Sequence, residues 1–165
     1  MEQTWDSPEA LARRYAGDVF RLAYARTGSR VDAEDVMQET FLRLLRARPA
    51  FADPEHAKAW LLRVAANCAN DFFRAPWRRR EGPLEGHEAL PAPAEPEEGG
   101  VVEAVLALPA KYRVPIHLYY YEEVGVAEIA RILGKSEGAV KSQLFRARAL
   151  LRDMLKEDDD VSEQL

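Results

Sequence analysis

The sequence predicts an all-α fold of two small helical domains joined by a flexible linker. Apolar residues recur at three- and four-residue spacing on both sides of the middle of the chain, and no stretch alternates as a strand would. Residues 81–100 hold four prolines, four glycines and six acidic residues without a base, a composition that cannot bury enough surface to fold. We therefore expect domains at 1–80 and 101–156, a linker at 81–100 and an acidic tail at 157–165.

The first domain is expected to hold three helices. The first runs from about Pro8 to Thr27 and stops at Gly28, a residue that ends helices well. Asp32 is expected to cap the second helix. The apolar side of that helix carries Ala33, Met37, Thr40, Phe41 and Leu44. Two prolines in "RPAFADPEH" break the pattern before a third helix over about 54–75. The buried stripe of the third helix is expected to be Leu61, Val64, Cys68 and Phe72.

The second domain begins with a short helix over about 101–108. Pro109 starts another helix that runs towards Glu123, and Pro115 inside it is expected to kink or restart it. Two further helices follow, over about 126–133 and 137–156.

The segment "VAEIARILGKSEGAVKSQLFRARALL", residues 126–151, has the spacing of a helix-turn-helix. Ala130 is small where the two helices would cross, Gly134 allows the sharp turn, and Ser136 can cap the second helix. Val140 begins the buried stripe of the second helix. The stripe continues through Leu144, Ala147, Leu151 and Met154.

The polar side of that second helix carries cations and an aromatic residue. At about 100° per residue, Lys141, Ser142, Phe145 and Arg146 surround the point opposite the core, and Arg148 and Arg152 lie on one flank. In a helix-turn-helix this helix enters the major groove, where such side chains can contact base edges. A solvated basic face is the alternative. Phe145 favours a face that binds nucleic acid over a merely solvated one, because an exposed aromatic side chain gains nothing from contact with water.

The net charge of -5 hides a division along the chain. Residues 1–80 and 101–156 each carry a net charge of +3, whereas 81–100 carry -6 and 157–165 carry -5. The basic helix therefore belongs to a basic segment, and the acidic residues are concentrated in the linker and the tail.

Several classes of protein find no support in the sequence. The one cysteine cannot form an internal disulfide, the N-terminus has no apolar h-region, and no apolar run approaches the ~20 residues of a membrane span. The expectation is a cytoplasmic protein. No residue spacing suggests a metal site, a cofactor site or catalysis, so we expect a protein that is not an enzyme and has no cofactor.

Three segments together resemble the extracytoplasmic-function (ECF) group of bacterial sigma factors, over about residues 8–156 and in that family's order. "LPAKYRVPIHLYYYEEVGVAEIARILGKSEGAVKSQLFRARALLRDML" is similar to the family's fourth domain, which reads the -35 element. "DAEDVMQETFLRLLR" resembles the helix of the second domain that binds the clamp helices of RNA polymerase. "FADPEHAKAWLLRVAANCANDFFRAPWRRR" resembles the segment that melts and reads the -10 element.

The resemblance implies roles for residues at matching positions. The polymerase-binding surface, on the face of the second helix away from its apolar stripe, would comprise Asp35, Gln38, Glu39, Leu42 and Arg46. The -10 contacts would be Phe51, Trp60, Asn67, Asp71, Arg74, Arg78, Arg79 and Arg80. The -35 contacts would be Ser136, Lys141, Ser142, Phe145, Arg146 and Arg148.

Some of these residues have a structural alternative. Leu42 can be a scattered surface leucine, Trp60 can pack in the core, and Asn67 and Asp71 can brace the fold. Lys135, Pro115, Lys141 and Gln143 depart from the family's usual residues, and the departures at 141 and 143 bear on the -35 sequence preference.

The implied partners are core RNA polymerase, promoter DNA and an anti-sigma factor. Domain 2 would bind the clamp helices, domain 4 the flap, and no part would insert into a membrane. The function implied is promoter-directed initiation of transcription in response to stress. The alternatives are a stand-alone helix-turn-helix regulator and an adaptor that binds no DNA. The acidic linker either mimics the charge of nucleic acid or is a solvated tether. The acidic tail either competes with DNA for the basic helix or is a solubilising terminus.

Overall fold

The computed structural model describes residues 5–72, 74 and 100–163. Every regular element within these residues is helical, which confirms the all-α prediction. The chain divides into two compact units, Met1–Ala94 and Glu95–Leu165. The expected domain boundaries at 80 and 101 remain predictions, since the linker lies almost wholly outside the described residues. None of the helices described has both the length and the apolar character that crossing a membrane requires.

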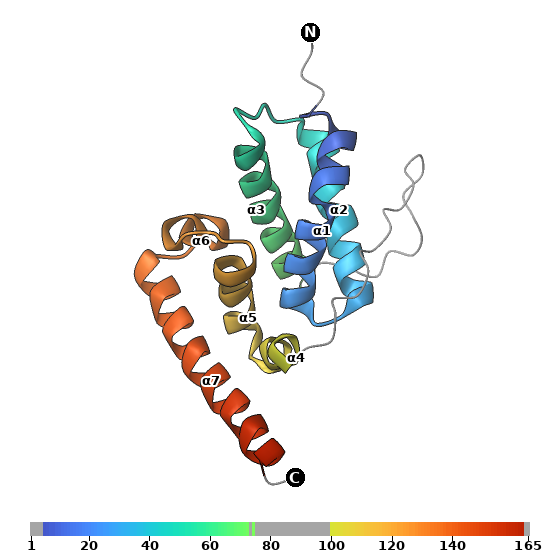
Figure 1. Ribbon diagram of the computed structural model, residues 1–165. Helices are drawn as coiled ribbons and strands as arrows, with labels where there is room; N and C mark the ends of the chain where they lie inside the picture. The colour runs from blue at the N-terminus through green and yellow to red at the C-terminus, as the bar shows by residue number, and fades with distance from the viewer. Residues whose placement is uncertain (1–4, 73, 75–99, 164–165) are drawn as a thin grey trace. The chain divides into compact units, whose positions relative to one another are not determined.

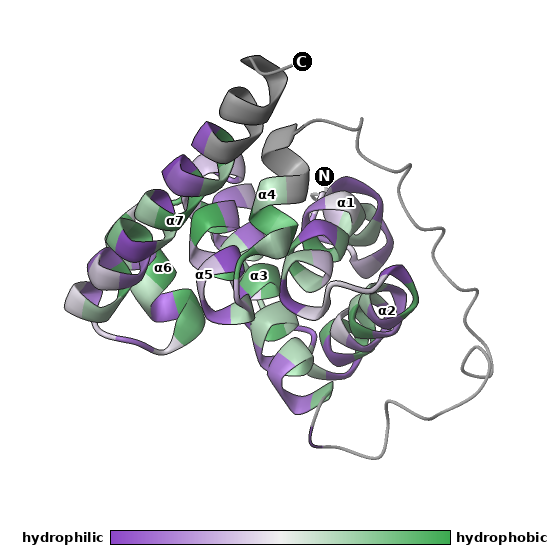
Figure 2. Ribbon diagram, turned by 90° about the horizontal axis from the view of Figure 1, so that it is seen from below, coloured by the Kyte–Doolittle hydropathy of each residue, from purple (hydrophilic) through white to green (hydrophobic). Residues whose placement is uncertain are grey.

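The N-terminal unit is a bundle of three helices, α1 (Pro8–Thr27), α2 (Arg30–Ala47) and α3 (Pro54–Phe72), that lie side by side (Figure 1). Their hydrophobic sides meet in the middle of the bundle (Figure 2). Burying each large side chain there contributes about 1.5–3 kcal/mol. The largest fully buried side chains of this core are Leu11, Val19, Leu22, Val36, Met37, Leu44, Leu61 and Leu62.

The ends of α1 follow the prediction, and the start of α2 does not. The Ser7 hydroxyl accepts a hydrogen bond from the Ala10 N–H (3.2 Å), and Gly28 ends α1 in the left-handed region at φ 70°. The cap of α2 is Ser29, whose hydroxyl accepts from the Asp32 N–H (3.3 Å). The prediction that Asp32 is the cap is therefore wrong. Asp32 lies inside the first turn, where its charge still favours the helix dipole.

Two hydrogen bonds tie α3 to α1 near its two ends. The Tyr15 hydroxyl donates to the Pro54 carbonyl (3.0 Å), and Arg26 Nε donates to Asn70 Oδ1 (3.2 Å). The helix ends at Phe72, earlier than the expected 75, because the Arg74 N–H bonds the Asp71 carbonyl (2.8 Å) in a tighter turn.

The C-terminal unit contains α4 (Gly100–Ala107), α5 (Ala110–Ile116), the π-helix η2 (His117–Tyr121), α6 (Val126–Leu133) and α7 (Glu137–Glu163). Its core gathers Leu108, Leu118, Ile129, Val140, Leu144 and Ala147. The backbone of α7 stays helical well beyond residue 156. The expected end of this helix at about 156 is therefore wrong, since α7 runs to Glu163, and the acidic tail at 157–165 remains a prediction from composition.

Pro115 was expected to kink or restart the helix, but α5 runs through it to Ile116 and a π-helix follows directly. A proline has no N–H to continue the α-helical ladder, and two residues later the chain changes to a π-helix. The π-helix buries Leu118 and exposes Tyr119, Tyr120 and Tyr121. His117 stacks on Tyr121 (5.2 Å between ring centroids), and its Nε2 lies 3.5 Å from Glu122 Oε1 in the interior.

Candidate nucleic-acid interface

The turn between α6 and α7 has the backbone geometry that a helix-turn-helix needs. Gly134 ends α6 at φ 65°, in the left-handed region, and the Lys135 N–H donates to the Ala130 carbonyl (2.9 Å). Two residues later the Ser136 hydroxyl accepts from the Ala139 N–H (3.1 Å) and caps α7. Ser136, a predicted DNA contact, therefore also has a structural role. Its side chain is exposed, immediately before the first residue of α7.

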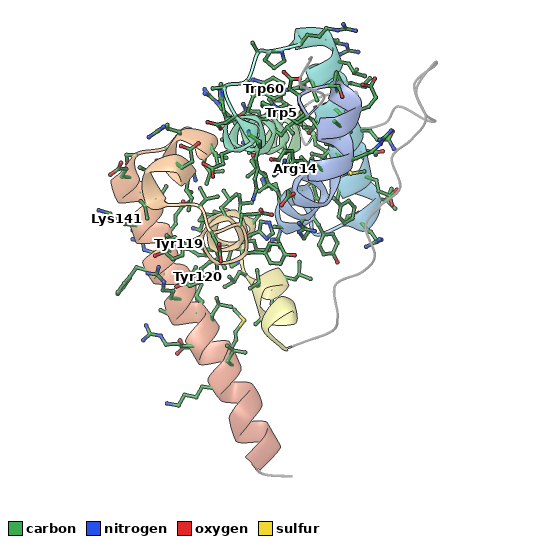
Figure 3. All side chains as sticks on the ribbon, turned by 45° about the horizontal axis from the view of Figure 1, so that its top comes forward. Trp5, Arg14, Trp60, Tyr119, Tyr120 and Lys141 are labelled. Atoms are coloured by element: carbon green, nitrogen blue, oxygen red, sulfur yellow. The ribbon has the colours of Figure 1, made fainter. Side chains whose placement is uncertain are left out.

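The polar side of α7 faces solvent as the sequence analysis predicted. Val140, Leu144 and Ala147 are buried, and Lys141, Ser142, Phe145 and Arg146 are exposed. Phe145 is 67% exposed, an unusual state for a phenylalanine. Lys141 is labelled on α7 in Figure 3. One side of this helix thus offers an aromatic ring, a hydroxyl and two cations to an external ligand.

Arg148 is the exception among the predicted -35 residues. Its side chain is only partly exposed, and its guanidinium lies over the rings of Tyr119 and Tyr120 from the π-helix. Its Nε donates a hydrogen bond to the Tyr120 hydroxyl. Arg148 therefore has a fixed position in the folded unit, whereas Lys141 and Arg146 lie on the exposed side.

The loop before α3 carries a small aromatic cluster, which we define as Phe51, His56 and Trp60. Phe51 meets His56 edge to face (5.4 Å between centroids) and Trp60 in the same manner (5.7 Å). His56 is held in place because its Nδ1 accepts from the Ala52 N–H (3.1 Å) and its backbone N–H donates to Asp53 Oδ1 (2.8 Å). Phe51 and Trp60 are partly exposed, so Trp60 (Figure 3) is a surface residue of this cluster rather than a core residue.

The remaining -10 candidates divide into three groups. The side chains of Asn67 and Arg74 are exposed. Asp71 braces the fold, because its Oδ2 lies 3.4 Å from Arg43 Nη2 on α2. The three arginines predicted to bind phosphates, Arg78, Arg79 and Arg80, lie outside the described residues.

The residues of α2 that the resemblance assigns to polymerase binding differ in exposure. Asp35, Gln38 and Leu42 are half-buried, and Arg46 is exposed. Glu39 is only 8% exposed, so its predicted place away from the core is wrong. It is buried because Arg43 and Arg46 fold over it, with Nε and Nη1 at 3.4 and 4.0 Å from Glu39 Oε1.

Asp35 on α2 and Cys68 on α3 both have raised pKa values. Partial burial, together with the neighbouring carboxylates of Asp32 and Glu34, raises the pKa of Asp35 above its ordinary value. Burial raises the pKa of the Cys68 thiol to about 11, although nearby Arg43 partly offsets the effect. Cys68 is thus the buried structural thiol that the sequence indicated. Within the described ranges, no group of three potential metal ligands comes together.

Sequence reasoning missed Arg43, Tyr119 and Tyr120. Arg43 follows Glu39 by four residues, a spacing at which opposite charges meet on a helix, so it could have been found. The run of three tyrosines at 119–121 was visible, but the π-helix that sets their directions was not.

Comparisons with known proteins match both units. The family models "Sigma-70 region 2" and "Sigma-70, region 4" match residues 11–79 and 100–151. The ECF RNA polymerase sigma factor SigE of Mycolicibacterium smegmatis is 34% identical over 98% of this chain, and SigL of Mycobacterium tuberculosis is 34% identical over 90%. The chain spans 65% of the length of that SigE and 88% of the length of SigL.

Among solved structures, the sigma factor RpoE of Bartonella quintana, in complex with the anti-sigma factor NepR, has a similar fold. Its TM-score is 0.68, with 20% identity over 90% of this chain and 96% of that one.

Proposed function

Because the chain belongs to the ECF group of the sigma-70 family of RNA polymerase sigma factors, we propose that it binds core RNA polymerase and directs it to specific promoters. The observation that carries this proposal is the presence of a region 2 unit and a region 4 unit in one chain, in that order. A stand-alone regulator would need only the helix-turn-helix, and an adaptor would need neither unit's exposed aromatic residues.

The C-terminal unit reads the -35 element in this proposal. The start of α7 enters the major groove, where Lys141 and Arg146 bind guanine edges and Ser142 binds a neighbouring base. Phe145 packs against a thymine methyl group, which explains why a phenylalanine is kept in solvent in the free protein. Each good bidentate contact gives about 1–3 kcal/mol of discrimination between bases.

The N-terminal unit binds the melted -10 element. The aromatic cluster of Phe51, His56 and Trp60 offers ring faces and edges for an unstacked base, a contact that is worth about 1–3 kcal/mol per base. Asn67 and Arg74 extend this surface along α3, and Arg78, Arg79 and Arg80 contact phosphates. Asp71 acts indirectly, since its pairing with Arg43 fixes α3 against α2.

The polymerase-binding surface lies on α2 and comprises Asp35, Gln38, Leu42 and Arg46. Leu42 is half-buried in the free chain and would bury its remaining apolar surface against the clamp helices. The buried Glu39 carboxylate stabilises this surface because it forms ion pairs with Arg43 and Arg46. The C-terminal unit would bind the flap of the polymerase.

The wider biology of the proposal comes from the family resemblance. We propose that an anti-sigma factor holds the chain inactive until a stress signal releases it, and that it works in the cytoplasm as an initiation factor rather than an enzyme.

A transcription assay tests the proposed function against both alternatives. The full chain is added to core RNA polymerase and a pool of promoter fragments, and transcripts are mapped. Transcripts with defined start sites, absent without the chain, support a sigma factor. Sequence-specific DNA binding without polymerase association would instead indicate a regulator, and the absence of both activities would indicate an adaptor.

A further inference from the structure

Arg148 is held flat on the surface of the C-terminal unit by two tyrosines. Its guanidinium carbon lies 5.4 Å from the ring centroid of Tyr119 and 5.5 Å from that of Tyr120, and its Nε donates to the Tyr120 hydroxyl. The two rings meet edge to face, with centroids 4.9 Å apart. Figure 3 labels both tyrosines on the C-terminal unit. We call this group the Arg148 clamp.

The clamp leaves the charge of Arg148 unpaired. Among the described side chains, no acidic group forms an ion pair with Arg148, and its hydrogen bond to Tyr120 uses only Nε. The two terminal nitrogens remain as donors in a planar fork, the geometry that suits a phosphate or carboxylate. The exposed rings are 36% and 56% accessible, and they fix the plane of that fork by cation–π contact.

Arg148 lies on a row of cations along one flank of α7. At about 100° per residue, it lies within about 20° of Lys141 and about 40° of Arg152 around the helix axis. Within the described residues, none of these three side chains forms an ion pair. Arg148 is two turns beyond Lys141, or about 10 Å along the axis. A helix that reads bases with its first turns brings this flank alongside the sugar–phosphate backbone that borders the groove.

We propose that Arg148 binds a backbone phosphate beside the -35 element, and that Tyr119 and Tyr120 are the positioning residues that hold its guanidinium for this contact. The inference rests on the proposed function, because it requires α7 to lie in the major groove. Arg148 then contributes to affinity and register and does not distinguish bases. A base-reading arginine must extend into the groove, whereas Arg148 is folded back onto two rings at the flank.

A protein-binding role is the competing use of these exposed tyrosines. The row of unpaired cations favours DNA, because a phosphate backbone presents negative charge along the whole row. The row is also continuous with the exposed reading side of α7 that carries Phe145 and Arg146.

The test uses the full chain bound to core RNA polymerase and the promoter fragments that this complex selects from a random pool. Binding of the fragments is measured between about 50 and 200 mM salt. Arg148→Ala removes one phosphate contact, so the slope of log K against log salt should become shallower by about 0.9. Over that salt range the wild type should therefore lose about three- to fourfold more affinity than Arg148→Ala. The loss caused by the substitution should be the same for every selected sequence.

The Tyr120→Phe variant tests positioning. It keeps the ring and the charge, so the salt slope should stay unchanged, but affinity should fall because the guanidinium loses its hydrogen bond. In the Arg148→Ala background, Tyr120→Phe should have no further effect on affinity. Lys111→Ala is the matched control, since Lys111 also lies over a tyrosine ring (5.0 Å from the Tyr112 centroid) but on α5. It should alter neither affinity nor slope.

Three results would overturn the inference. A change in preference at one base position in Arg148→Ala would make Arg148 a base reader. Loss of polymerase binding with unchanged affinity for DNA would make the clamp a protein-docking surface. Additive effects of the two substitutions would show that Tyr120 does not act through Arg148. If the wild-type complex selects no promoter at all, the proposed function fails, and that outcome is separate from these three.

Discussion

Gly134 provides a direct test of the turn on which the reading helix depends. Its φ of 65° lies in the left-handed region, and a Cβ added there would meet no atom within 4 Å. Gly134→Ala therefore creates no clash, and its cost is the backbone penalty of a left-handed alanine, about 1–2 kcal/mol. Gly125 is the matched control, because a Cβ there also meets nothing within 4 Å but φ is -70°. Gly125→Ala should change the free energy of unfolding by less than about 0.5 kcal/mol, since a small loss of capping offsets a less flexible unfolded chain.

Two spectroscopic signals separate the units in this experiment. The three tryptophans, Trp5, Trp60 and Trp77, all belong to the N-terminal unit, so tryptophan fluorescence follows that unit alone. Far-ultraviolet circular dichroism follows helices in both units. For a domain of this size, each kcal/mol shifts the melting temperature by about 4–8 °C. Gly134→Ala should thus lower the dichroism transition of the C-terminal unit by roughly 4–16 °C and leave the fluorescence transition in place.

Equal stability of the two alanine variants would show that Gly134 is not held in the left-handed region. An equal shift of both transitions in Gly134→Ala would show instead that the two units unfold together.

The other predictions concern the N-terminal unit. Arg43→Ala should lower its free energy of unfolding by about 1–3 kcal/mol, because the buried Glu39 carboxylate loses its nearer partner and Asp71 loses its link to α2. Arg46→Ala, which removes a more distant and mostly exposed partner, should cost less than about 1 kcal/mol in the same fluorescence-detected unfolding. For Cys68, the unfolded thiol loses its proton near its ordinary pKa of 9.0 and the folded thiol only near 11, so stability should fall as pH rises between these values. Cys68→Ala should lack this component, and parallel pH profiles for the two proteins would contradict the assignment.

The helix boundaries show which signals in a sequence determine local structure. Gly28 and Gly134 were predictable as helix ends, since both adopt the left-handed region that glycine occupies at little cost. The cap of α2 was not, because serine and aspartate both cap helices and only the geometry distinguishes Ser29 from Asp32. The continuation of α7 into an acidic segment was missed because charge composition alone does not disfavour a helix.

The parts of the candidate site that were predictable are those in which the period of a single helix decides which side chains are exposed. The period of α7 correctly gave the exposed positions of Phe145 and Arg146. Glu39 was placed on the wrong side because its burial depends on two arginine side chains that fold over it. The Arg148 clamp was beyond prediction, since it joins residues 28 positions apart through a π-helix that no sequence pattern indicated.

The central claim is that one unit reads the -35 element while the other holds the polymerase, and a crossed comparison of variants tests it most directly. Affinity for core RNA polymerase and binding of the resulting complex to a selected promoter are measured for Arg146→Ala, Leu42→Ala and Asp35→Ala. Arg146→Ala should weaken recognition of the -35 element, by the roughly 1–3 kcal/mol of one base contact, and leave polymerase binding intact. Leu42→Ala and Asp35→Ala should weaken polymerase binding and leave sequence preference intact. Equal loss of both activities in all three variants would contradict this division of roles.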